Sequence, residues 1–194
     1  MIINYYGHSY FKIQGEYSIA LDPFGDIGLP IKKVSANYVF SSHGHYDHNN
    51  FSAVTGAKII TSSGGNFEII NSYHDEVFGK KRGFNNVLKF KINEKVAVFM
   101  GDIGFVDENV VNFSKNCDVL FIPVGGVYTI NANKAKEYVD KINPKIVIPM
   151  HYKMQGCNVD VANIEEFTNL FTNVKWVNGP YEITNEDSGI IVIR

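Results

Sequence analysis

The first hundred residues alternate short apolar runs with turn residues. Runs of about four to eight residues that are rich in Val, Ile, Phe and Tyr and bounded by Gly, Pro, Asn or Asp are typical of strands. This pattern predicts strands at 2–6, 10–14, 17–21, 36–41, 58–61, 67–73, 86–92 and 95–100. Turn residues at 15–16 and 93–94 predict hairpins, and a short helical segment is expected at 49–54.

The longer helical patterns lie in the second half of the chain. They predict helices at 134–142 and 161–171, which alternate with strands at 118–123, 145–149, 174–177 and 190–193. The segment before residue 118 fits either a loop or a helix. No repeat, low-complexity tract or Pro/Gly/Ser-rich linker marks a boundary. We therefore expect residues 1–194 to form one α/β domain in which helices cover sheets.

Composition narrows the class of partner. The chain is 45% hydrophobic and 20% charged, with a net charge of −2, and its only basic run is 80–82. We expect a small-molecule substrate and no nucleic acid, and the sequence leaves room for a homo-oligomer. Cys117 and Cys157 form no CxxC pair, which favours reduced thiols and a cytoplasmic location. No signal-like start and no apolar run of about 20 residues is present, so no membrane span is expected.

Five of the predicted strands run directly into a residue that can bind metal. These residues are Asp22, His43, His74, Asp102 and His151. Strand ends can meet at one edge of a fold, where loops are held rigidly and expose polar side chains. A single strand-terminal aspartate can equally well serve a local turn, and for Asp22 both roles stay open.

The densest group of such residues lies at His43-Gly44-His45-Tyr46-Asp47-His48, with four ligand types in six residues. Imidazole and carboxylate suit zinc, manganese and iron, and no cysteine lies nearby to close a structural zinc site. An open, catalytic metal site is indicated. A tight loop would let His43 and His45 face one ion while Asp47 and His48 face a second.

This segment resembles the HxHxDH signature of the metallo-β-lactamase superfamily. The resemblance continues in order through 73–74, 101–104, 123–126 and 149–152, so it covers nearly the whole chain. Small stand-alone members related to the ascorbate-6-phosphate lactonase branch are the most similar, and they share a Gly-His-Ser element like that at 7–9. The resemblance implies a four-layer αββα sandwich.

The resemblance also implies two divalent metal ions, with zinc as the first expectation and manganese or iron as alternatives. The first ion would be bound by His43, His45 and His74, and the second by Asp47, His48 and His151, with Asp102 bridging. Asp47 and Asp102 would be the catalytic carboxylates. A hydroxide that bridges the ions would attack an ester-like bond, a lactone or a phosphodiester, in a small anionic substrate.

Six further residues are candidates for substrate binding: His8, Lys81, Arg82, Gly126, Thr129 and Tyr152. The cations of the loop after His74 could meet an anion, or the loop could be a solvated basic turn. The segment around Gly126 could offer backbone N–H groups as a second wall. His8 could support a ligand, contact substrate or simply be a core histidine, and Tyr152 could polarise a leaving group or only pack.

Two other functions fit the same scaffold. One is an iron-dependent redox protein that acts on oxygen or sulfur species, and the other is a non-catalytic metal or ligand sensor. The redox relatives carry a carboxylate at the position of His74 and a flavin domain, which this chain lacks, and its seven intact ligand positions argue against a sensor. The spacing of 26 positions between His48 and His74 (74 minus 48) is short for a β-lactamase, and no insertion resembles the tRNA-binding arm of the ribonuclease relatives.

Overall fold

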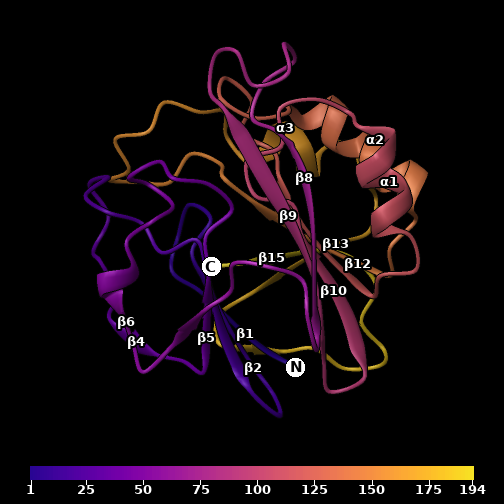
Figure 1. Ribbon diagram of the computed structural model, residues 1–194. Helices are drawn as coiled ribbons and strands as arrows, with labels where there is room; N and C mark the ends of the chain where they lie inside the picture. Colours follow the sequence, from indigo (N-terminus) through magenta and orange to yellow (C-terminus); the bar gives the residue numbers. More distant parts are fainter.

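The computed structural model describes residues 1–194, and two sheets packed face to face form its centre (Figure 1). The six-stranded sheet has the order β14-β1-β2-β3-β5-β7. Its strands are β1 (Ile2–Tyr5), β2 (Phe11–Gln14), β3 (Ser18–Leu21), β5 (Tyr38–Phe40), β7 (Lys58–Ile59) and β14 (Tyr181–Glu182). Strands β1 to β3 form an antiparallel meander, and β5 and β7 continue parallel to β3.

The seven-stranded sheet has the order β13-β15-β12-β11-β10-β9-β8. Its strands are β8 (Phe67–Tyr73), β9 (Phe84–Ile92), β10 (Lys95–Phe99), β11 (Val119–Pro123), β12 (Ile146–Met150), β13 (Val174–Val177) and β15 (Gly189–Ile193). Strands β8, β9 and β10 pair antiparallel. The remaining neighbours in the sheet, from β10 to β11, β12, β15 and β13 in that order, pair parallel. Every residue of β11 and β12 is buried, as expected for parallel strands covered on both faces.

Aromatic side chains fill the space between the sheets. Phe11 and Phe40 of the six-stranded sheet face Phe99 and Phe121 of the seven-stranded sheet within a buried cluster. The rings of Phe11 and Phe121 meet edge to face with centroids 5.0 Å apart, a favourable aromatic geometry. This core fixes the two sheets against each other and therefore the relative positions of their strand ends.

Three helices cover the outer face of the seven-stranded sheet (Figure 1): α1 (Glu108–Ser114), α2 (Ala132–Ile142) and α3 (Glu165–Thr168). Tyr138 and Phe167 of the helices pack with Leu120 and Val147 of the sheet. The Asn131 side chain caps α2 by accepting a hydrogen bond from Lys134 N–H, which satisfies one of the free N–H groups at the helix start.

The outer face of the six-stranded sheet is covered by irregular chain, by the 3-10 turn η1 (Phe51–Ala53) and by a small sheet of β4 (Val34–Ser35) and β6 (Val54–Thr55). Tyr10, Phe24 and Val39 form the core on this side. The expected α/β class with two central sheets is confirmed, but this layer contains no α-helix. The segment 23–30 contains two prolines and two glycines, which disfavour a helix.

Two predicted helical segments differ from the structure. The helix predicted at 161–171 is only the turn 165–168, because Ala162 N–H donates to the Gly125 carbonyl and Ala162 C=O accepts from Lys153 N–H. The segment 49–54 forms the 3-10 turn η1 rather than a longer helix. Strands β4, β6 and β14 were not predicted from the sequence, because each is only two residues long. Cys117 and Cys157 are buried and unpaired, and none of the helices has the length and apolar character that crossing a membrane requires.

Candidate metal centre

Loops from one end of both sheets bring the predicted ligands together. From the six-stranded sheet, the turn after β1 provides His8, the end of β3 provides Asp22, and the loop after β5 provides the segment 43–48. From the seven-stranded sheet, the ends of β8, β10 and β12 provide His74, Asp102 and His151. The site thus lies at the junction of the two sheets.

The first cluster consists of His43, His45 and His74. One ligand atom from each lies within 4.8 Å of the others, and the His43 ring centroid is 4.6 Å from those of both His45 and His74. These are the three residues that the resemblance assigns to the first ion. Their spacing permits them to bind a single ion.

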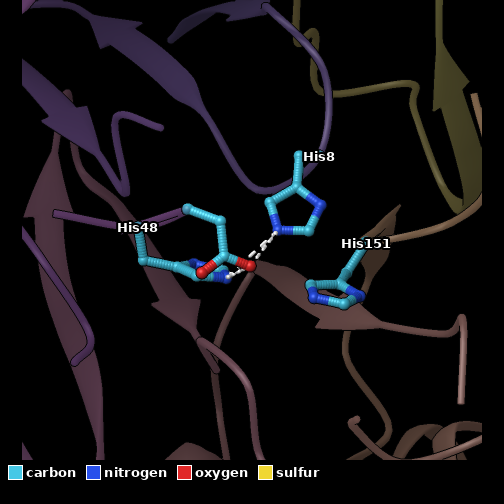
Figure 2. Close-up of side chains that lie close together, drawn as sticks. His8, His48 and His151 are labelled. Carbon is cyan, nitrogen blue, oxygen red and sulfur yellow. Dashed lines mark hydrogen bonds and ion pairs between the residues drawn. The ribbon is translucent and has the colours of Figure 1, made fainter. Parts of the chain in front are cut away.

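The second cluster consists of Asp47, His48, His151 and, in addition, His8, again with ligand atoms within 4.8 Å of one another. Figure 2 shows the rings of His8, His48 and His151 turned toward a common centre. His8 Nε2 is 3.2 Å from His48 Nε2 and 3.3 Å from Asp47 Oδ2. The structure therefore places His8 among the predicted ligands and not in a hydrophobic core.

Asp102 lies between the two clusters. Its Oδ2 atom is 3.2 Å from His74 Nε2 in the first cluster, and 3.2 and 3.1 Å from the Nε2 atoms of His48 and His151 in the second. A single carboxylate thus faces both groups. This is the placement that a bridging ligand requires.

Two buried polar atoms of these residues, His43 Nε2 and Asp102 Oδ1, have no hydrogen-bond partner within the protein. Unsatisfied buried polar groups are costly and uncommon. Divalent ions would satisfy them, and a set of imidazoles and carboxylates without thiolates suits zinc, manganese or iron. The residues present therefore fit the metal ions that the fold implies.

Asp22 and Ser42 orient histidines of both clusters. Asp22 is fully buried, and its Oδ2 atom lies 2.8 Å from His48 Nδ1 and accepts a hydrogen bond of 2.6 Å from Ser42 Oγ. Ser42 Oγ is in turn 2.8 Å from His43 Nδ1. A carboxylate bound to one imidazole nitrogen fixes the tautomer that presents the other nitrogen to a metal. Asp22 therefore orients the ligand histidines through their Nδ1 side. Ser42 was not predicted from the sequence.

Burial and neighbouring charges set the protonation of the cluster. Burial and the nearby His48 lower the pKa of His43 to about 2, and burial and His151 lower the pKa of His8 to about 3. Burial opposes ionisation of Asp102, but the surrounding histidines outweigh it and hold its pKa well below the usual value. Burial also disfavours the cationic forms of His48 and His74, but the neighbouring carboxylates outweigh it and raise both pKa values. A metal ion at either cluster would therefore displace a proton from one of these rings.

Glycines allow the ligand loops to approach each other closely. Gly101, which precedes Asp102, has a φ of +56°, and a Cβ there would lie 2.4 Å from both Ser42 Cβ and Asn85 Oδ1. Asn85 Oδ1 accepts a hydrogen bond of 2.8 Å from Asp102 N–H. Any larger residue at position 101 would therefore displace the loop that carries Asp102.

A cavity of about 610 Å³ opens beside the clusters. Its walls include His45, Asp47, His74 and Asp102 together with Tyr46, Arg82, Tyr128, Asn158 and Asp160. The Arg82 guanidinium donates a 3.3 Å hydrogen bond to the Val127 carbonyl and lies 5.6 Å from the centroid of the Tyr128 ring. A cation and an aromatic ring thus stand on the same wall, next to the predicted ligands.

The loop that carries Arg82 is built around the buried carboxylate of Asp75. This carboxylate accepts hydrogen bonds from four backbone N–H groups, at 2.9 Å from Val77, 2.9 Å from Gly79, 3.0 Å from Lys81 and 2.7 Å from Arg82. These bonds lower the pKa of Asp75 against a desolvation effect that raises it. The Asp75 carboxylate therefore fixes the backbone conformation of this loop.

The other predicted substrate residues do not line the cavity. Lys81 is exposed and pairs with Glu76, with 2.7 Å between Nζ and Oε1. Gly126 lies outside the cavity wall, the Thr129 hydroxyl donates to the Ile130 carbonyl at 3.1 Å, and Tyr152 is buried in the core beneath the helices. Sequence reasoning missed Asn158 and Asp160, which reach the site because Asn158 N–H donates to the Ile27 carbonyl and folds this loop back.

Comparison with known proteins identifies the family of this chain. The sequence profile of the beta-lactamase superfamily domain matches residues 2–151. A UPF0173 metal-dependent hydrolase of Symbiobacterium thermophilum is 30% identical over 188 residues, covering 78% of this chain and 84% of the relative. One of Nanoarchaeum equitans is 29% identical over 185 residues, with the same two coverages.

Solved structures lead to the same family. The crystal structure of a Thermotoga maritima protein of the metallo-beta-lactamase superfamily superimposes with a TM-score of 0.82. It is 29% identical, and the match covers 99% of this chain and 97% of the other. The chain belongs to the metallo-β-lactamase superfamily and is a metal-dependent hydrolase of it.

Proposed function

We propose that this protein hydrolyses an ester-like bond, in a lactone or a phosphodiester, of a small anionic substrate with the help of two divalent metal ions. The observation that carries the proposal is the pair of adjacent ligand clusters on either side of Asp102. Zinc is the first expectation for both ions, and manganese and iron suit the same donors.

Metal ions at these clusters would supply Lewis acidity and lower the pKa of a shared water toward neutrality. The residues of the chain provide the rest. His43, His45 and His74 would hold the first ion. Asp47, His48 and His151 would hold the second, and Asp102 would set the distance between them. The Asp47 carboxylate borders the cavity, so it can accept a hydrogen bond from the attacking water and orient it toward the substrate.

The anionic character of the substrate is inferred from Arg82. Its guanidinium is held on the cavity wall by the Val127 carbonyl and the Tyr128 ring, and the Asp75 loop fixes its backbone. A planar guanidinium that faces a metal site can bind a phosphate or carboxylate group through charge-assisted hydrogen bonds. Lys81 is directed to Glu76 instead and takes no part in the proposal.

The test combines metal analysis with a substrate panel. Protein purified without added metal would be analysed for zinc, manganese and iron per chain. It would then be assayed on paired lactones and phosphodiesters with and without a second anionic group, and on a β-lactam. We expect two metal equivalents, hydrolysis of one ester class and a preference for the anionic member of the pair. Bound iron with no hydrolysis of any substrate would contradict the proposal.

A further inference from the structure

His8 occupies a turn that the fold holds in an unusual conformation. Gly7 and His8, between β1 and β2, both have positive φ, +105° and +54°. The His8 carbonyl accepts hydrogen bonds of 2.8 Å from His151 N–H and 2.9 Å from the Tyr5 hydroxyl. A positive φ is uncommon outside glycine, and two hydrogen bonds fix it here. The His8 ring is thereby buried and directed at the second cluster (Figure 2).

The distances within the second cluster resemble the edges of a coordination sphere. Donors at about 2.1 Å from one ion lie roughly 3.0 to 3.4 Å from each other in octahedral or tetrahedral geometry. His8 Nε2 is 3.2 Å from His48 Nε2 and 3.3 Å from Asp47 Oδ2, and His48 Nε2 is 3.5 Å from Asp47 Oδ2. The three atoms therefore surround a common point at distances that suit one ion.

A hydrogen bond alone accounts less well for this arrangement. His8 Nε2 is almost equidistant from its two neighbours, so a proton on it would be directed into the space that they share. His48 has its Nδ1 atom 2.8 Å from Asp22, so its Nε2 atom is the one that faces that same space. An ion bound by His48 and Asp47 would therefore compete with the His8 proton for one position.

We propose that His8 is a fourth protein ligand of the second metal ion. This inference rests on the proposed two-metal function. Apart from the shared Asp102, the second ion then has three imidazoles and one carboxylate, from His8, His48, His151 and Asp47. The first ion has three imidazoles. The two sites then differ in their number of protein ligands.

The experiment replaces His8 with glycine and titrates the metal-free protein with Co²⁺. Glycine adopts a positive φ without strain, so His8→Gly keeps the turn while it removes the imidazole. We expect wild type to bind two equivalents. In the variant one equivalent should bind more weakly by at least about 10- to 100-fold, which is the loss that removing an outer-shell partner of a ligand already causes. The visible absorption of that Co²⁺ should change, and added imidazole should restore both affinity and spectrum.

The matched control is His8→Phe, which keeps an aromatic ring beside His151, whose centroid is 4.1 Å from that of His8. It should lose the same affinity but gain nothing from imidazole, because the space for imidazole is filled. Unchanged affinity and spectrum in His8→Gly would overturn the inference while leaving the proposed function intact. Weaker binding with an unchanged spectrum and no imidazole rescue would also overturn it, because His8 would then act only through Asp47. A wild-type protein that binds fewer than two ions would contradict the proposed function itself.

Discussion

At the scale of single residues, Asp22 connects the two ligand clusters through one carboxylate. Its two oxygens accept from Ser42 N–H, the Ser42 hydroxyl and the His48 ring. Asparagine has only one acceptor oxygen, so in Asp22→Asn either the Ser42 backbone or His48 loses its partner. We expect metal affinity to fall about 10- to 100-fold, measured by competition with a chromophoric chelator. Asp26→Asn, an exposed change in the same loop, should leave the affinity unchanged.

Arg82 and Lys81 are neighbours with different surroundings, which allows a matched test of the substrate charge. Arg82→Gln removes the cation from the cavity wall, and Lys81→Gln removes one that pairs with Glu76 outside it. For an anionic substrate we expect Arg82→Gln to raise KM about 10-fold or more, the value of one charge-assisted hydrogen bond. Lys81→Gln should leave KM near that of wild type. Equal effects of Arg82→Gln on anionic and neutral substrates would argue against an anionic substrate.

These residues also show what the sequence can reveal of a site. The segment 43–48 can be recognised from the sequence because its ligand types are adjacent in the chain. The strand ends at 74, 102 and 151 provide the other predicted ligands. Asp22 had two open roles because a strand-terminal aspartate is common in turns. Lys81 and Arg82 could not be distinguished, because the direction of each side chain depends on the hydrogen bonds around Asp75, which no local pattern encodes.

At the scale of elements, strands were predicted more reliably than helices, because alternation within a strand reports directly on its two faces. In β2, Phe11 and Ile13 are buried while Lys12 and Gln14 are partly exposed. The segment 161–171 has a helical pattern, but the hydrogen bonds of Ala162 to Gly125 and Lys153 hold its start in another conformation. Such tertiary contacts override local propensity and are invisible in sequence.

The turn between β14 and β15 offers a test of stability against pH. Asp187 is buried there and accepts hydrogen bonds of 2.8 Å from Lys175, 2.7 Å from the Tyr181 hydroxyl and 2.8 Å from Thr184 N–H. Burial opposes its ionisation, but these bonds outweigh it and lower its pKa below the usual value. The folded state therefore gains stability from Asp187 above the unfolded pKa of about 3.9, and this gain is lost as pH falls through the lower folded pKa.

We expect Asp187→Asn to lower the free energy of unfolding at pH 7 by about 1–2 kcal/mol, because Lys175 is half exposed and water screens part of the interaction. The difference from wild type should shrink as the pH falls below about 4. Urea unfolding of chelator-treated protein at pH 7 and pH 3 measures the loss of stability and its dependence on pH. Glu186→Gln, an exposed change in the same turn, is the control. A difference that stays constant with pH would show that the charge of Asp187 contributes nothing.

At the scale of the whole molecule, the candidate metal centre joins the two sheets. His43, His48 and Asp47 come from the six-stranded sheet, whereas His74, Asp102 and His151 come from the seven-stranded sheet. Each cluster therefore contains ligands from both sheets. An ion in either cluster would cross-link the two halves of the sandwich, so binding should couple directly to folding.

Removal of metal should consequently lower the thermal stability. A ligand that binds only the folded state adds about 4 kcal/mol when its concentration is 1,000 times Kd. In a chain of this length each kcal/mol corresponds to roughly 2–4 °C in Tm. We expect EDTA to lower Tm by about 10 °C and added Zn²⁺ to restore it, as measured by circular dichroism. His74→Ala, which removes a ligand of the first cluster only, should keep part of the shift, because the second cluster still joins the sheets. A Tm that does not change when metal analysis shows complete removal would mean that the sheets are held by the Phe11 and Phe121 core alone.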